Sequence, residues 1–155
     1  MTAQVQKAAP RMIPRFDTLT SFERDSSGSG ISFGDFATNL MRQPNRRQWH
    51  RHDYFELFYF EHGTGMHRND FQDYPVASPA LVFVNAGHVH AWPESQSLRG
   101  RMLSFDAGFI WNPGSLQRPG TLFLPPAPVV LALDAPGAES VGGLFRRISA
   151  EWEER

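Results

Sequence analysis

The sequence has no cysteine, no long apolar run and no excess of charge of one sign. The absence of cysteine among 155 residues excludes disulfides and thiolate metal sites. No stretch approaches the roughly 18 apolar residues of a membrane span, and the N-terminal residues lack the apolar core of a signal peptide. A net charge of −1 gives no basic field for direct binding of nucleic acid. We therefore expect a cytoplasmic protein with no membrane partner.

The length suits one domain with a sizeable core, and composition divides the chain into three parts. Residues 1–30 include the polar, Gly/Ser-rich stretch SFERDSSGSG, so we expect a partly flexible N-terminal arm there. Residues 31–135 are predicted to form a barrel, and residues 136–155 a C-terminal dimerisation or linker helix.

The segment predicted to form the barrel consists of short apolar runs and of runs in which apolar and polar residues alternate. Segments such as DYFELFYF, ALVFV and HVHAW are separated by Gly, Pro, Asn and Asp. This pattern is typical of an all-β sandwich or barrel. We expect no helix between residues 31 and 110.

The C-terminal segment ESVGGLFRRISAEWEER changes to a helical period. Val141, Leu144, Ile148 and Trp152 recur at spacings of three and four, which predicts an amphipathic helix. The pattern reaches the last residue without a terminating signal, so we expect the chain to be a fragment of a longer protein. From the residues alone, the apolar stripe fits either the chain's own barrel or a second subunit.

The stretch HRHDYFE, residues 50–56, carries the main candidate site. Alternate residues of a strand share a face, so His50, His52 and Glu56 should point into the same space. His90, after the strand ALVFV, is the candidate fourth member from a neighbouring strand. Three imidazoles and a carboxylate suit a divalent transition metal. The alternative, which we favour, is a hydrogen-bonded polar cluster inside the barrel.

Other side chains admit two interpretations each. Six aromatic residues are expected to pack in the core, and the alternative is that they form the wall of a pocket: Tyr54, Phe58, Phe60, Phe83, Trp92 and Phe105. Four arginines form a basic cluster that is expected to lie on a solvated strand edge, and the alternative is that they bind an anionic effector: Arg42, Arg46, Arg47 and Arg51. Three further histidines, His62, His67 and His88, are expected to be exposed.

The stretch HRHDYFELFYFEHG resembles the first signature motif of the cupin superfamily, with Pro44 where the motif usually opens with glycine. The second motif is matched less well. Gly87 and His90 fall on its last glycine and histidine, but the sequence departs from it at Pro79, Asn85 and Glu94. We therefore expect no transition metal, or a substoichiometric amount.

The longer series from HRHDYFELFYFEHG to HVHAW, followed by LRGRMLSFDAGFI, resembles the amino-terminal domain of AraC-type transcription regulators. The resemblance implies a cupin-like jelly-roll barrel that binds a small effector, followed by a dimerising helix. Such regulators continue into paired helix-turn-helix units. That region is not present here, so DNA is expected as a partner only through it.

These observations predict a sensor domain and not an enzyme. The expected partners are a second copy of the chain and an effector, either a sugar or a small organic acid. The predicted effector-binding residues are His50, His52, Tyr54, Glu56, Phe58, His90 and Trp92. The predicted dimerisation residues are Leu144, Ile148 and Trp152. The alternative is a metal-dependent cupin enzyme of the dioxygenase or isomerase type, with His50, His52, Glu56 and His90 as ligands.

Overall fold

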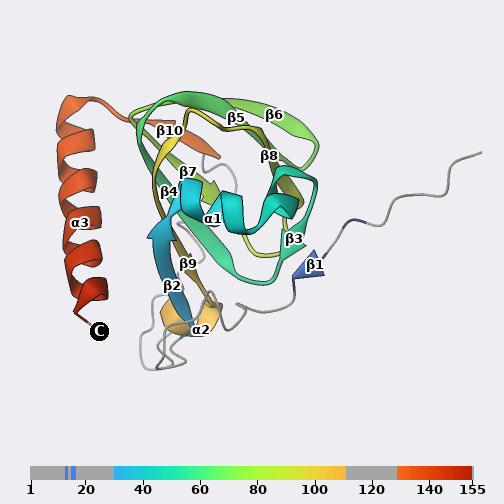
Figure 1. Cartoon of the computed structure of the whole chain (residues 1–155), viewed down its shortest axis with the longest axis horizontal. Coiled ribbons are helices and arrows are strands. Elements are labelled where there is room, and N and C mark those ends of the chain that lie inside the picture. The colour runs from blue at the N-terminus through green and yellow to red at the C-terminus, as the bar shows by residue number, and fades with distance from the viewer. Residues whose placement is uncertain (1–12, 14, 17–29, 111–128, 155) are drawn as a thin grey trace, which may run out of the picture.

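The computed structural model describes residues 13, 15–16, 30–110 and 129–154, so most of the predicted arm lies outside the described residues. Short strands dominate, and three helical segments and a long helix join them (Figure 1). In chain order the elements are β1 (Arg15–Phe16), β2 (Ile31–Asp35), α1 (Phe36–Arg42), η1 (Pro44–Arg47), β3 (Arg51–His52), β4 (Phe55–His62), β5 (Thr64–Asn69), β6 (Gln72–Ala77), β7 (Ala80–Val84), β8 (His90–Glu94), β9 (Arg99–Phe105), α2 (Ala107–Ile110), β10 (Val130–Ala132) and α3 (Ala135–Glu153).

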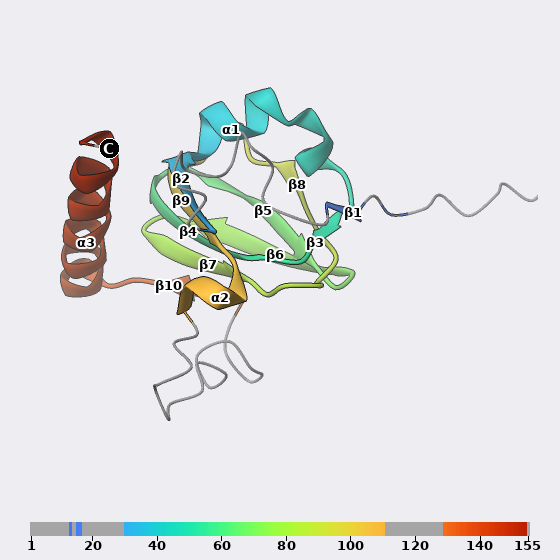
Figure 2. The same cartoon turned by 90° about the horizontal axis from the view of Figure 1, so that it is seen from below.

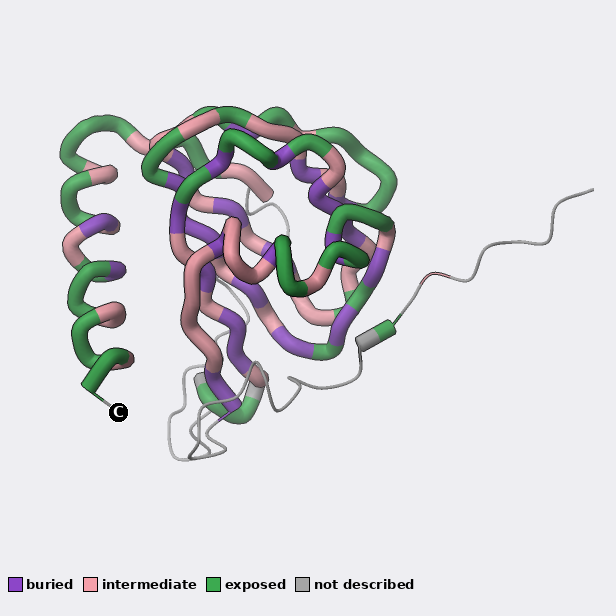
Figure 3. The backbone as a smooth tube through the Cα atoms, viewed as in Figure 1, coloured by how far each residue is buried: buried purple, intermediate pink, exposed green. Residues whose placement is uncertain are grey.

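Eight of the ten described strands form two facing sheets, and β1 and β3 pair in parallel as a separate two-stranded sheet. One has five strands in the order β10-β7-β4-β9-β2, and the other has three in the order β6-β5-β8. All pairings in these two sheets are antiparallel. The buried residues lie mainly along the strands, whereas α3 is largely exposed or half-buried (Figure 3). The prediction of an all-β, cupin-like jelly-roll barrel is confirmed.

The turn between β4 and β5 contains Gly63, the glycine that closes the cupin-like motif. Its φ of +94° lies in the region that favours glycine. A Cβ there would also stand 2.0 Å from the carbonyl oxygen of Ser97. Only glycine therefore fits this turn, which leads the chain from β4 in the first sheet to β5 in the second.

Helix α1 was not expected from the sequence. Asp35 caps it by accepting a hydrogen bond from the backbone N–H of Thr38 at 2.8 Å. Phe36 and Leu40, one turn apart, are buried. Phe36 packs edge-on against Phe60 and Trp92 inside the barrel, with ring centroids 4.9 and 5.0 Å away. Helix α1 and the adjoining η1 therefore close one end of the barrel (Figure 2).

Helix α3 lies along the outside of the five-stranded sheet (Figure 1). Phe145 is its buried anchor: its ring lies 5.2 Å from that of Tyr59 and 6.2 Å from that of Phe33. Trp152, predicted to join a dimer contact, also lies 6.2 Å from Phe33 of the same chain. Of the other two predicted dimer residues, Ile148 is half-buried and Leu144 is 55% exposed.

We expect Phe145→Ala to lower the free energy of unfolding by about 3 kcal/mol, because it empties the main contact between α3 and the sheet. The matched control is Leu144→Ala, one residue away and exposed, which should change it by less than about 0.5 kcal/mol. Urea unfolding of both variants measures the difference. Equal effects would mean that α3 does not depend on Phe145 for its packing.

Candidate functional site

The predicted site residues converge inside the barrel. His50 and His90 pair across an isolated antiparallel bridge, with backbone N–H donors 2.9 and 2.8 Å from the partner's carbonyl oxygen. This register places His90 beside the first strand of the motif, where the sequence predicted it. The predicted effector-binding residues are all at most 1% exposed: His50, His52, Tyr54, Glu56, Phe58, His90 and Trp92.

Backbone carbonyls orient two of the imidazoles. His50 Nδ1 lies 2.9 Å from the carbonyl oxygen of Gln48, and His52 Nδ1 lies 2.7 Å from that of Tyr54. Because a carbonyl oxygen can only accept, each Nδ1 carries the hydrogen, and a neutral ring presents Nε2 as an acceptor. The Nε2 atoms of His50 and His52 therefore direct their lone pairs into the cluster.

His52 Nε2 stands at the centre of the cluster. It lies 3.0 Å from His90 Nε2 and 3.1 Å from Glu56 Oε2. A neutral His52 and an ionised Glu56 would face one another as two acceptors. A proton or a bound cation is therefore needed between them.

The three histidines fit a divalent transition metal. The ligand atoms of His50, His52 and His90 all lie within 4.8 Å of one another. Two metal–nitrogen bonds of about 2.1 Å at a right angle place the nitrogen atoms about 3.0 Å apart, which matches the separation of His52 and His90. Nitrogen donors with one carboxylate oxygen also match what such ions prefer.

Glu56 is shared between this cluster and Arg46. Arg46 enters from η1 and is only 4% exposed. Its Nη1 donates to Glu56 Oε1 at 2.5 Å, its Nη2 to Tyr54 Oη at 3.1 Å, and its Nε to Gln43 Oε1 at 2.8 Å. Burial by itself would raise the pKa of Glu56, but the Arg46 guanidinium and His52 hold it well below its usual range. Glu56 is therefore ionised.

Arg46 was predicted with its neighbours as part of a solvated strand edge, and for this residue the prediction is wrong. Arg42, Arg47 and Arg51 are exposed, whereas Arg46 is buried. The reason is η1, a single turn that begins at Pro44 and directs one arginine inward while its neighbour Arg47 points to solvent. A charge run in a sequence does not show which of its members has a buried acid within reach.

His67 belongs to the site although it was expected to be exposed. On β5 it faces the interior and is fully buried, with its ring stacked 4.4 Å from that of Trp92. Its Nε2 lies 3.4 Å from His90 Nδ1. The signal was the alternation of TGMHRN, which puts His67 and Asn69 on one face. Burial lowers the pKa of His67 to about 3 and that of His50 to about 4, and lowers that of His90 well below its usual value.

The described residues pack closely at the α1 end of the barrel. The recess between α1 and the strands has no space for a water molecule. Its lining residues are Phe36, Asn39, Leu40, Arg46, Phe58, Trp92 and Met102. A ligand that enters through this recess must therefore displace part of α1 or η1.

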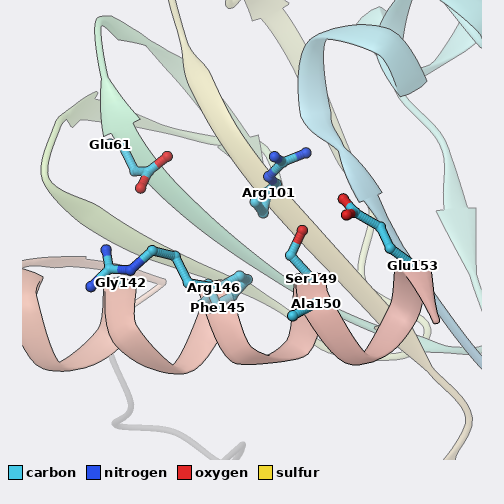
Figure 4. A pocket seen from close by; sticks show the side chains of 8 residues that line it. All are labelled: Glu61, Arg101, Gly142, Phe145, Arg146, Ser149, Ala150 and Glu153. Atoms are coloured by element: carbon cyan, nitrogen blue, oxygen red, sulfur yellow. The ribbon is translucent and has the colours of Figure 1, made fainter.

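A second recess, of about 280 Å³, lies outside the barrel between α3 and the sheet (Figure 4). Glu61 and Arg101 line it from β4 and β9, and Arg146 and Glu153 line it from α3. The two acids and two bases give it no net charge. None of the predicted site residues lies here.

Comparison with known proteins agrees with this architecture. A model of the AraC-like ligand binding domain matches residues 35–155. The chain belongs to this family. The match takes in the whole described barrel from α1 onward, together with α3, so the chain is a ligand-binding cupin domain of the AraC type. No curated protein matches the sequence.

Solved structures with a similar fold share little sequence with this AraC-like domain. A predicted oxalate decarboxylase from Thermotoga maritima is 16% identical over 48% of this chain and 79% of its own, with a TM-score of 0.34. A Cupin 2 conserved barrel domain protein from Salinispora arenicola is 16% identical over 52% and 79%, with a TM-score of 0.33. The Clostridium difficile EutQ protein is 17% identical over 61% and 82%, with a TM-score of 0.32. In the described part of the chain, no helix has the length and apolar character needed to cross a membrane.

Proposed function

We propose that this domain senses a small molecule inside the barrel, as the effector-binding part of a cytoplasmic AraC-type regulator. The observation that carries the proposal is the buried polar cluster of Arg46, Tyr54, Glu56 and the histidines. A barrel of this size could fill its interior with apolar side chains at lower cost in desolvation. Polar groups at the centre of an apolar wall are the usual make-up of a ligand site.

The chemistry of the cluster indicates the class of effector. Glu56 and the histidines can exchange hydrogen bonds with hydroxyl groups, and the guanidinium of Arg46 can bind a carboxylate. A sugar or a small organic acid is therefore the expected ligand. Because the recess beside Arg46 has no free space, a ligand that enters there must move η1 and so change how this end of the barrel is covered.

The proposal includes a homodimer and a DNA-binding region of the helix-turn-helix type. Leu144 provides apolar surface on the exposed side of α3. Ile148 and Trp152, on the same helix, are partly accessible. Sedimentation of Leu144→Glu against the unmodified chain tests the dimer without disturbing Phe145. DNA would be bound only by a helix-turn-helix region beyond this sequence.

The test of effector binding is thermal unfolding in the presence of a library of sugars and small organic acids. A ligand at 100 times its dissociation constant should stabilise the domain by about 2.7 kcal/mol. Glu56→Gln should abolish this stabilisation, whereas Glu61→Gln, exposed on the same strand, should retain it. A stabilising ligand that tolerates Glu56→Gln would place the effector site outside the barrel.

A metal-dependent enzyme is the second candidate, and the convergence of His50, His52 and His90 favours it. These three side chains with Glu56 would hold the ion, which when bound supplies Lewis-acid chemistry. The pairing of Glu56 with Arg46 weighs against it, because the carboxylate is already neutralised by a buried cation.

A further inference from the structure

The position of Arg46 has a consequence for the histidine cluster. Its guanidinium pairs with Glu56 Oε1, while Oε2 of the same carboxylate lies 3.1 Å from His52 Nε2 and 3.8 Å from His90 Nε2. The guanidinium and two of the imidazoles thus flank one carboxylate, each on its own oxygen atom. Every group in this arrangement is at most 4% exposed, so water screens little of the interaction between them.

The balance of charges determines which ions this buried cluster can bind. Glu56 with Arg46 is neutral, so a divalent ion bound by the histidines would leave two uncompensated positive charges in a buried site. Without Arg46, the same ion would leave only one, because Glu56 would offset the other. A buried arginine beside a shared carboxylate therefore opposes metal binding even where the histidines have the right spacing.

We propose that Arg46, through its buried positive charge, keeps divalent metal ions off the cluster of His50, His52 and His90. The residue acts through Glu56 and through its own charge, and it is held for this purpose by Gln43 and Tyr54. The metal selectivity stands apart from effector binding, so the failure of one leaves the other in place.

The experiment is a titration of the full chain with Co²⁺, followed by calorimetry and by the visible absorption of bound cobalt, on protein made without a polyhistidine tag. Arg46→Gln should bind one Co²⁺ per chain with an affinity about 10- to 100-fold higher than that of the unmodified chain. Arg47→Gln, which removes an exposed arginine from the same turn, should behave as the unmodified chain does. Adding His90→Ala to Arg46→Gln should remove the gain.

Equal or weaker Co²⁺ binding by Arg46→Gln overturns the proposal, as does a gain that survives His90→Ala. Weaker binding would show that Arg46 orients Glu56 for the metal instead of opposing it. If Arg46→Gln does not fold because Glu56 is left unpaired, the double variant Arg46→Gln/Glu56→Gln removes both charges and keeps the histidines. Because a bound Co²⁺ again leaves two uncompensated positive charges in this variant, it should bind the ion no more tightly than the unmodified chain, and a higher affinity would be decisive against the charge balance.

Discussion

The domain is expected to unfold in mild acid, with a midpoint between about pH 4 and 6, because its interior holds neutral histidines. The pKa of His50 falls from 6.5 to about 4 on folding, and that of His67 from 6.5 to about 3. At pH 7 both residues are neutral in the folded and unfolded states and have no effect. Below pH 6.5 the unfolded chain takes up protons at these sites and the folded chain does not, so falling pH favours unfolding.

The size of this effect is comparable with the whole stability of a domain. Each such histidine contributes about 1.4 kcal/mol per pH unit. Between pH 6.5 and pH 4 the two together remove about 5–6 kcal/mol, against a typical total of about 5–15 kcal/mol. Glu56 acts in the same direction at lower pH: its lowered pKa stabilises the fold above about pH 4.5, and this contribution is lost as the pH falls toward its folded pKa.

Urea unfolding at a series of pH values measures the number of protons taken up. His67→Gln should reduce the uptake by about one proton between pH 6 and pH 4.5. His62→Gln, which alters an exposed histidine, is the control and should leave the slope unchanged. A free energy of unfolding that stays constant from pH 7 to pH 4.5 would mean that the interior histidines are hydrated or charged in the folded protein.

The residues that follow a strand period were predictable. Alternation from His50 to Phe60 placed the histidines, Tyr54, Glu56 and Phe58 on one face, and that face is buried. The neighbour of His50 was also predictable, since a turn after ALVFV brings His90 back alongside it. Period and turn chemistry are local properties, so a single sequence carries them.

What was missed depends on contacts between distant segments. Helix α1 has seven residues, too few to show a period, and depends on Phe36 packing into the barrel. The buried residues of α3, Gly142 and Phe145, lay outside the apolar stripe read from the sequence, and a Cβ on Gly142 would stand 3.0 Å from Tyr59 Oη. The burial of Arg46 required knowledge that Glu56 lies within its reach. None of these contacts leaves a periodic signal.

Glu56→Ala is expected to lower the free energy of unfolding by about 3–5 kcal/mol, since it leaves the guanidinium of Arg46 buried without its carboxylate. The hydroxyl of Tyr54 and the amide oxygen of Gln43 can only partly compensate the positive charge. The double variant Arg46→Met/Glu56→Ala removes the stranded charge. It should therefore be more stable than Glu56→Ala alone, with a coupling energy of about 2–3 kcal/mol.

An exposed ion pair in the same barrel gives the matched control. Arg68 Nε lies 2.8 Å from Asp73 Oδ1, but the two side chains are 38% and 53% exposed. Asp73→Ala should cost no more than about 1 kcal/mol, because water replaces the lost partner. Both pairs join an arginine to a carboxylate, so a difference between the two free energies of unfolding reports the effect of burial and not the effect of the ion pair itself. If Glu56→Ala costs as little as Asp73→Ala, then the guanidinium of Arg46 reaches solvent, and the charge balance that keeps metal ions from the histidines does not hold.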